Sequence, residues 1–581
     1  MAREPALETT ALARDCATDA VAAFERYNAD FRAITRRAPV RFEERDWQGS
    51  QRDAVERIEL YGHHVEITVA SLKLRLGEVA LDRALWHEIK EQFARLIEAM
   101  PDAEFRKTFF NSLTRTFFGT VGVSPEIEFV ALDLDPLARV AEFAFMTSYA
   151  NRGSLPLLFE EVLSSFRCRS PWRDFERSAR YVAEEVARHI GLLAERRTVT
   201  HVEMIRPAFF QQTRAYLVGR LVGRDWQMPL AIALKNTAPG VLVDAVMTDD
   251  ADISILFSYS RSYFHVDLER VGKVVLFLKQ LMPRKPVSEL FTVIGRAKQG
   301  KTERYRELFR HLQTSTDRFV RAPGERGLVM VVFTLPSFDV VFKLIRDRFP
   351  AQKNIVRDDV LRKYEFVFKH DRAGRLVDAQ EFKRLRFPRR LFEQSLVEEL
   401  LQETAQTVHA EGEDLIIDHC YVERRMTPLN LYLRDASAED SALAVLEYGQ
   451  AIRDLAYTNI FAGDLLLKNF GVTRHKRVIF YDYDELCLIT DCRFRDLPSA
   501  SSDEDETRGE TWYYVADNDV FPETFLNFLA FSDAQREVFL RAHGELLTAD
   551  WWRGVQERIR QNEVLEVLPY GAHRVRVASS A

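Results

Sequence analysis

The stretch from 459 to 485, NIFAGDLLLKNFGVTRHKRVIFYDYDE, constrains the fold more than any other part of this sequence. Asp464 and Asn469 lie five positions apart in an expected loop, and Asp482 follows thirteen residues after Asn469. Between them, FGVTRHKRVIF is typical of a β-hairpin that turns at 474–476. One loop and one hairpin therefore have to hold two carboxylates and an amide close together.

The second strand of this hairpin indicates an ion site. Side chains alternate along a strand, so we expect Val478, Phe480, Asp482 and Asp484 on one side of it. Two carboxylates that follow two core residues on the same face suggest an ion bound at the end of the strand.

The pattern of apolar residues changes along the chain and divides it near residue 315. A length of 581 residues predicts two to four domains. Apolar residues recur at helical spacing over 15–200, whereas 214–265 carries short strand-like runs such as RAYLVGRLV. Helical spacing returns at 266–320. The sequence thus predicts an α+β protein, with a mostly helical domain over 1–315, a small β insertion near 214–265, and a second domain over 316–581.

Composition excludes several classes of function. The net charge of -7 leaves no basic field for nucleic acid. The sequence has neither the long apolar run of a membrane helix nor the apolar core of a signal peptide. The five cysteines show no C-x-x-C spacing and indicate reduced thiols. We therefore expect a cytoplasmic protein that binds neither nucleic acid nor membrane.

The second domain opens with residues suited to phosphate. Gly324 and Gly327 form a G-x-x-G turn before the strand LVMVVFTL, where missing side chains let backbone amides approach a phosphate. Lys343 interrupts the apolar strand VVFKLI, and such a lysine is costly to bury unless it meets an anion. For each feature taken alone, an ordinary turn and an edge-strand lysine facing water are the alternatives.

In their order, these features resemble the parts of a protein kinase, from the glycine turn and strand lysine to D-x4-N and a metal aspartate. Several positions depart from that pattern. The first loop has two glycines rather than three, and Gly463 stands where H-R-D has its arginine. Leu466 replaces the usual lysine, with Lys468 as a substitute, and Asp484 replaces the glycine of D-F-G. An ordinary eukaryotic-type kinase is therefore disfavoured.

Longer segments resemble the bacterial isocitrate dehydrogenase kinase/phosphatase family. They include GERGLVMVVFTLPSFDVVFKLIRDRF, YVERRMTPLN and the 459–485 stretch, and, in the first domain, RFEERDWQGSQRDAVERIELYGHHV and SRSYFHV. The resemblance implies a bifunctional enzyme that uses MgATP to phosphorylate a serine of isocitrate dehydrogenase and also removes that phosphate, which controls entry into the glyoxylate bypass. It further implies a two-lobed kinase-like domain over 316–581, a regulatory domain over 1–315, ATP/ADP and Mg²⁺ as cofactors, and AMP as an allosteric effector.

The resemblance also assigns roles to single residues. Asp464 is implied as the catalytic aspartate, Asp484 as an extra catalytic acid and Lys343 as a phosphate-binding lysine, with Asn469 and Asp482 as metal ligands. The implied nucleotide contacts are Ala322, Pro323, Gly324, Glu325, Arg326, Gly327, Leu328, Lys343, Glu423 and Met426, with the adenine against the backbone from Tyr421 to Met426. A helix-borne glutamate should orient Lys343, and the candidates on RRLFEQSLVEELLQET are Glu393, Glu398, Glu399 and Glu403.

Other functions stay open from the sequence. A kinase-like phosphotransferase for a small molecule also tolerates a changed H-R-D motif, although the large N-terminal half favours a protein substrate or a regulator. A pseudokinase scaffold would lack catalysis, and the joint presence of Lys343, Asp464, Asn469 and Asp482 argues against it. For Asp484, the alternative is a salt bridge to Arg474 or Arg477. The acidic stretch 503–507 predicts a solvated loop. We expect nucleotides and isocitrate dehydrogenase as partners, with a homodimer as a further option.

Overall fold

The computed structural model describes residues 3–130, 145–192, 198–258, 263–350, 355–497 and 514–570. The chain forms two compact units, one of Met1–Ser315 with Leu568–Ala581 and one of Thr316–Val567. It therefore leaves the first unit after Ser315 and returns to it at Leu568, whereas the sequence assigned everything after 315 to one domain. The acidic stretch 503–507 lies outside the described residues. Among the described helices, none combines the length and hydrophobicity that crossing a membrane requires.

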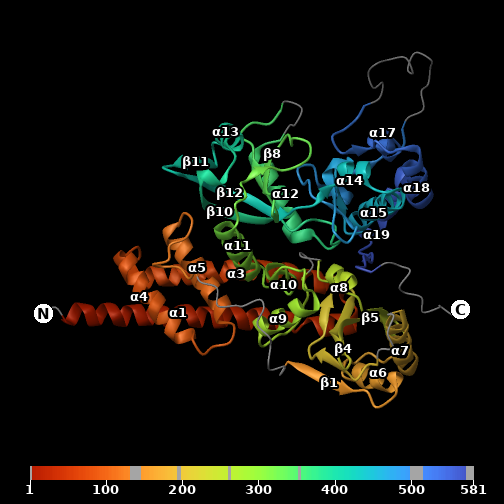
Figure 1. Cartoon of the computed structure of the whole chain (residues 1–581), viewed down its shortest axis with the longest axis horizontal. Helices are drawn as coiled ribbons and strands as arrows, with labels where there is room; N and C mark the ends of the chain where they lie inside the picture. The colour runs from red at the N-terminus through yellow and green to blue at the C-terminus, as the bar shows by residue number, and fades with distance from the viewer. Residues whose placement is uncertain are drawn as a thin grey trace. The chain divides into compact units, whose positions relative to one another are not determined.

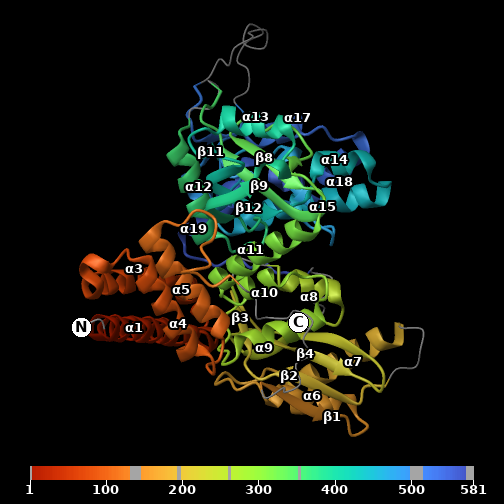
Figure 2. The same ribbon diagram turned by 60° about the vertical axis from the view of Figure 1, so that its left-hand side comes forward.

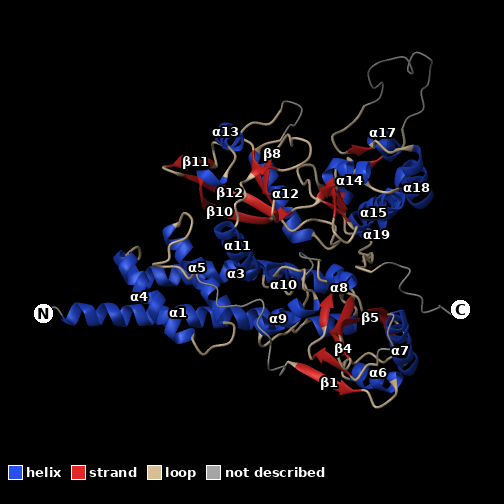
Figure 3. Cartoon of the chain, in the orientation of Figure 1, coloured by secondary structure: helices blue, strands red, loops and turns tan. Residues whose placement is uncertain are grey.

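The first unit begins with a helical bundle (Figures 1 and 3). The helical spacing of Leu85, Ile89 and Phe93 is confirmed, since all three side chains are buried in the bundle core. Small and aromatic residues of the first helix, such as Ala17 and Phe24, pack against them. The bundle comprises α1 (Arg3–Thr35), α2 (Ala38–Glu44), α3 (Trp47–Leu76), α4 (Arg83–Ile97) and α5 (Ala103–Phe118).

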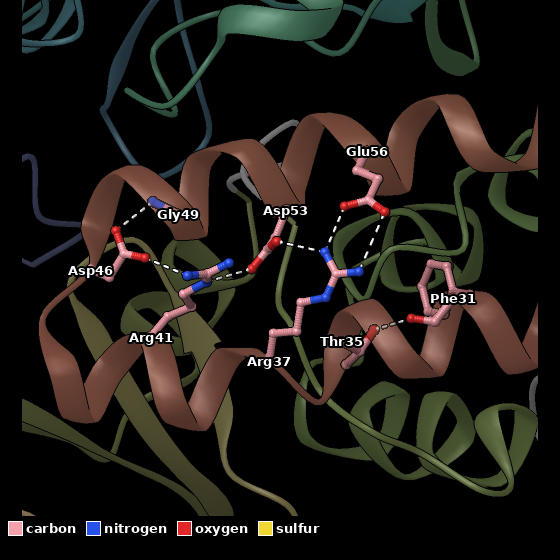
Figure 4. Close-up of polar contacts among 8 residues, drawn as sticks. All are labelled: Phe31, Thr35, Arg37, Arg41, Asp46, Gly49, Asp53 and Glu56. Carbon is pink, nitrogen blue, oxygen red and sulfur yellow. Dashed lines mark hydrogen bonds and ion pairs between the residues drawn. The ribbon is translucent and has the colours of Figure 1, made fainter.

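Ion pairs join helix α2 and Arg37, the residue before it, to α3 (Figure 4). Asp53 of α3 is almost fully buried and accepts hydrogen bonds from Arg37 Nη1 at 3.0 Å and Arg41 Nε at 2.9 Å. Asp46 caps α3 by accepting from Gly49 N at 2.8 Å, and it also pairs with Arg41. A buried carboxylate needs such partners, because leaving it unpaired would be costly. The RFEERDWQGSQRD segment thus stabilises a sharp helical corner.

A sheet buried on both faces follows the bundle. Leu217 faces α6 (Leu155–Ser164) and α7 (Phe175–Leu192), while its neighbour Tyr216 faces the opposite core. Burial of both faces explains the continuous apolar runs read in the sequence. The sheet order is β1 (Met146–Ala150), β2 (His201–Ile205), β4 (Arg214–Val222), β5 (Gln227–Thr237) and β6 (Gly240–Met247), with β3 (Phe209–Gln211) paired to β4.

The sheet is larger than the β insertion predicted from the sequence. Strands β1 and β2 lie outside 214–265, and the two helices between them hide their pairing from a local pattern. After β6 the chain turns helical, since Asp249 accepts from Asp252 N at 2.7 Å and caps α8 (Asp250–Leu256). Among the described residues that follow in this unit are the helices α9 (Val271–Leu281), α10 (Val287–Val293) and α11 (Ala297–Thr314).

The second unit has two lobes, and Figure 2 shows the sheet of the first lobe with β8, β9 and β12 side by side. The predicted strand, turn and strand over 322–349 are confirmed as β8 (Met330–Leu335) and β9 (Phe338–Ile345). The sheet order is β10 (Gln380–Pro388), β12 (Asp414–Arg424), β9, β8 and β7 (Val320–Arg321), with β11 (Val408–Glu411) paired to β12. Helices α12 (Arg357–His370) and α13 (Gln394–Glu403) belong to the same lobe.

The other lobe is mostly helical and carries the predicted hairpin. Strands β15 (Phe470–Val472) and β16 (Val478–Phe480) pair with Val472 opposite Val478, so the turn falls where the sequence predicted it. A short ladder of β14 (Ile460–Phe461) and β17 (Cys487–Leu488) lies next to it along the chain. The surrounding helices are α14 (Leu429–Asp435), α15 (Ala438–Tyr457), α17 (Phe525–Phe528), α18 (Asp533–His543) and α19 (Ala549–Arg560).

Candidate active site

One cleft of the second unit brings together the residues with implied catalytic, metal-binding and nucleotide-contacting roles, although they are distant in sequence. Its cavity has a volume of ≈ 220 Å³. The lining includes Ala322, Pro323, Gly324, Glu325, Arg326, Gly327, Leu328, Lys343, Glu423, Met426, Asp464, Asn469, Asp482 and Asp484. It also includes Arg321, Arg346 and Tyr481, which the sequence did not single out. Glu423, Arg424 and Met426 of the expected adenine-binding backbone line the cleft, and the side chain of Tyr421 is buried against Tyr364, with ring centroids 3.8 Å apart.

The loop between β7 and β8 forms one wall of the cleft. Gly324 has φ of 123°, a conformation that favours glycine. A side chain at Gly327 would place its Cβ 3.0 Å from Met330 O, so the backbone approaches closely there. Glu325 pairs with Lys468 of the opposite lobe at 3.3 Å. The loop is therefore shaped by backbone constraints and tied across the mouth of the cleft.

Lys343 is held by a strand glutamate. Its Nζ lies 2.7 Å from Glu423 Oε2 and donates to Tyr481 O at 2.6 Å. Glu423 is 1% exposed, and burial raises the pKa of its carboxyl, an effect that the Lys343 ammonium opposes. The β9 and β12 strands place the two side chains together, because Lys343 faces Tyr421 in the register and Glu423 lies two residues further on. The expectation that a helix glutamate orients Lys343 is therefore wrong.

Two of the helix glutamates, Glu399 and Glu403, pair instead with arginines in and beside the 322–328 loop. Glu399 of α13 accepts from Arg321 Nε at 3.0 Å and lies 3.3 Å from Arg326 Nη2, while Glu403 pairs with Arg326 and Arg346. Arg346 Nε also donates to Gly327 O at 3.1 Å. Glu393 and Glu398 are exposed. Helix α13 follows β10 along the chain, and its glutamates contact the arginines rather than Lys343.

An aromatic residue of α12, Tyr364, lies beside the buried Lys343–Glu423 pair. Tyr364 lies on α12, the helix between the lysine strand and β10, and its hydroxyl is 3.5 Å from Glu423 Oε1. Burial raises the pKa of Tyr364 well above its ordinary value, and the charge of Glu423 adds to this effect. A phenol of α12 therefore contacts Glu423, and the carboxylate that pairs with Lys343 comes from the strand β12.

The loop after β14 positions Asp464 and Asn469. Asp464 Oδ1 accepts from Leu466 N at 2.9 Å, and Asn469 Nδ2 donates to Asp464 O at 3.3 Å. The amide group of Asn469 is thus oriented with its oxygen available to a ligand. Tyr481 N donates to Asn469 O at 3.0 Å, which joins this loop to the segment that carries Asp482.

The strand that carries Val478 and Phe480 ends before the acidic residues. β16 stops at Phe480, and Tyr483 turns inward so that its hydroxyl donates to Val377 O at 2.7 Å. The simple alternation predicted through Asp482 and Asp484 is therefore wrong, because the strand ends at Phe480 and Tyr483 turns into the core. Both aspartates line the cleft from a loop.

The donor set fits magnesium. Asp482 and Asn469 offer a carboxylate and an amide oxygen, which are hard ligands of the kind that Mg²⁺ takes together with phosphate oxygens. The described ranges contain no group of three or more His, Cys, Asp or Glu side chains that could hold a metal ion. A metal ion whose coordination shell is completed by nucleotide phosphates needs only these few protein ligands.

Comparisons with known proteins identify the family. The family model described as "Isocitrate dehydrogenase kinase/phosphatase (AceK) kinase domain" matches residues 317–572, and the corresponding regulatory-domain model matches 17–316. The chain belongs to the isocitrate dehydrogenase kinase/phosphatase family. Proteins of that name from Anaeromyxobacter sp. (strain Fw109-5) and Anaeromyxobacter dehalogenans (strain 2CP-C) are 48% and 47% identical to it, over 94% and 97% of this chain and 95% and 98% of their own lengths.

A third relative extends the similarity to another genus. The isocitrate dehydrogenase kinase/phosphatase of Xanthomonas campestris pv. campestris (strain 8004) is 46% identical over 94% of this chain and 95% of its own length. The family assignment confirms the resemblance read from the segments at 324–349, 421–430 and 459–485. Arg346 could have been found there too, because it follows the lysine strand within the first segment, whereas Arg321 lies three residues before that segment.

Proposed function

We propose that this chain phosphorylates a serine of isocitrate dehydrogenase with MgATP and removes the same phosphate. Its relatives carry the name isocitrate dehydrogenase kinase/phosphatase, which fits these two activities. The observation that supports the proposal is the convergence of the nucleotide loop, Lys343, Asp464 and the Asn469–Asp482 pair on one cleft. A pseudokinase would not need this complete set. The proposed consequence is control of carbon flow between the citric acid cycle and the glyoxylate bypass.

In this proposal the backbone of the 322–328 loop and the ammonium of Lys343 hold the nucleotide phosphates. Asp464 accepts the proton of the substrate serine, and Asn469 and Asp482 hold the metal. Bound Mg²⁺ would supply charge neutralisation on the phosphates. The contacts of Lys343 to Glu423 and Tyr481 O fix the ammonium before the nucleotide arrives, which lowers the cost of ordering it.

One assay tests this function against its alternatives. The purified chain is incubated with isocitrate dehydrogenase and labelled ATP, and then excess ADP with unlabelled ATP is added. Incorporation of label followed by its loss supports both activities. A small-molecule phosphotransferase would leave isocitrate dehydrogenase unlabelled while still turning over another acceptor, and a scaffold would bind ATP without either reaction.

Asp484 is proposed to serve dephosphorylation. A carboxylate beside the metal ligand Asp482 would repel ATP phosphates, so the kinase reaction has little use for it. The phosphatase reaction needs a group that orients or deprotonates the attacking water. We expect Asp484→Ala to impair phosphate removal far more than phosphate transfer, whereas Asp464→Ala impairs both. Equal losses in Asp484→Ala, with its circular dichroism unchanged, would instead favour the salt bridge to Arg474 or Arg477.

AMP is proposed as an effector that acts through the N-terminal region. Calorimetry on the full chain and on a variant truncated before residue 316 tests this, because coupling between two sites must be reciprocal. AMP affinity that is unchanged by truncation, or by ATP, would contradict it. The proposed cytoplasmic location and a homodimer are tested separately, by fractionation and by light scattering.

A further inference from the structure

Two cysteines face each other directly behind the catalytic loop. Cys487 lies in β17 and is half-buried, and Cys492 follows five residues later and is buried. Their sulfurs are 3.5 Å apart. A disulfide needs about 2.05 Å between sulfurs, so the two would have to approach by only about 1.5 Å.

The backbone around both cysteines is held from separate sides. Cys487 pairs with Phe461 in the β14–β17 ladder. On the other side, Gln556 of α19 donates to Cys492 O at 2.8 Å and to Ile489 O at 2.7 Å. Because both backbones are anchored, the sulfurs stay opposed and can meet mainly by side-chain rotation.

The surroundings favour a reactive thiolate on one of the two. The hydrogen bond from Cys492 lowers the pKa of Cys487; burial opposes this shift and the nearby Lys363 ammonium supports it. Lys363 is fixed by its own hydrogen bond to Leu486 O at 2.6 Å. The pKa of Cys492 is raised, first by the hydrogen bond to Cys487 and then by burial. A low-pKa cysteine beside a resolving thiol is the arrangement of redox sensors.

We propose that Cys487 and Cys492 form a reversible disulfide when the protein meets a hydroperoxide. The Cys487 thiolate attacks one peroxide oxygen, the O–O bond breaks, and the departing oxygen takes a proton and leaves as water or an alcohol. Cys492 sulfur then attacks the Cys487 sulfenic acid, the S–O bond breaks, and the hydroxide leaves as water with the thiol proton. Two thiols are oxidised and one peroxide is reduced.

This disulfide would act on the catalytic loop. Gly463, next to Asp464, has φ of 76°, and a Cβ there would lie 2.5 Å from Glu485 O. The segment that leads into Cys487 therefore touches the loop that carries Asp464. A displacement of 1 Å at a reacting group can cost about a hundredfold in rate. We expect only part of the movement of the cysteines to reach Asp464, and therefore a roughly tenfold reduction in the rate of phosphoryl transfer. This consequence depends on the proposed function, whereas the disulfide itself does not.

Mass spectrometry of the full-length protein tests the disulfide without any activity assay. The protein is treated with hydrogen peroxide, alkylated with N-ethylmaleimide and digested with trypsin. Both cysteines fall in one tryptic peptide, 478–493. We expect this peptide to lose two hydrogens and carry no alkyl group, and to regain both alkylation sites after dithiothreitol.

Two cysteine variants separate the attacking role of Cys487 from the resolving role of Cys492. Cys492→Ser should leave a dimedone-reactive sulfenic acid at Cys487, whereas Cys487→Ser should leave Cys492 unoxidised. Cys168→Ser, which removes another half-buried thiol, is the matched control and should behave as wild type. Full alkylation of both cysteines after peroxide, or sulfinic acid in place of the disulfide in the wild-type peptide, would overturn the proposal. A disulfide with an unchanged kinase rate would overturn the coupling to the catalytic loop.

Discussion

Replacing Glu423 with glutamine tests the most specific feature of this site. In the structure the Lys343 ammonium depends on a strand carboxylate, whereas kinases in general take this carboxylate from a helix. Glutamine keeps the shape and one acceptor but removes the charge. The substitution therefore tests whether the charge of Glu423 is needed to hold the Lys343 ammonium in position to bind phosphate.

The expected loss of kcat/KM in Glu423→Gln follows from the geometry of the ion pair. At 2.7 Å the attraction between unit charges amounts to about 6 kcal/mol with an effective dielectric constant of roughly 20, and desolvation offsets part of it. Breaking a buried pair typically costs about 3–5 kcal/mol, and the acceptor kept by glutamine restores about 1 kcal/mol. A net loss of about 3 kcal/mol, expressed fully in phosphoryl transfer, lowers kcat/KM for ATP roughly a hundredfold.

Steady-state phosphorylation of isocitrate dehydrogenase at varied ATP concentration measures this loss. Glu398→Gln is the matched control, because Glu398 lies on α13, is exposed and accepts a hydrogen bond from Gln394 at 2.8 Å. We expect the control to stay within twofold of wild type. A Glu423→Gln variant that keeps its circular dichroism and a kcat/KM within twofold of wild type would refute the reasoning, as would an equal loss in the control.

Three further outcomes follow from the structure. Asp482→Ala should reduce the kinase rate by hundreds-fold or more, because the metal neutralises the phosphates, and near-normal turnover would contradict its assignment. Glu399→Gln should raise the KM for ATP about tenfold with a smaller effect on kcat, since it frees Arg321 and Arg326 of the nucleotide loop, and initial rates measure this. Burial holds the pKa of His265 well below its ordinary value of 6.5, so the unfolded chain takes up a proton that the folded chain does not, and stability is lost as pH falls below 6.5. Calorimetry should show wild type losing about 1.4 kcal/mol more than His265→Asn for each pH unit below that value.

Much of this molecule was predictable because its signals are local. The spacing of Leu85, Ile89 and Phe93 predicted a helix, and the hairpin of 470–480 followed from alternation and a polar turn. Many of the residues that line the cleft were also available, because the segments at 324–349, 421–430 and 459–485, on which the family resemblance rests, carry them. Side-chain type and spacing alone predict the helix and the hairpin.

The partners of those residues were decided only by tertiary structure. Lys343 and Glu423 are eighty positions apart, and only the antiparallel register of β9 and β12 brings them together, which leaves the α13 glutamates to the loop arginines. Strands β1 and β2 pair across two intervening helices, and Tyr483 turns into the core where alternation placed it on the other face. A local pattern records which side chains are apolar or charged, but it does not record which distant side chain meets a buried charge. That choice depends on burial, because a buried charge requires a partner and only the assembled sheet determines which carboxylate is within reach.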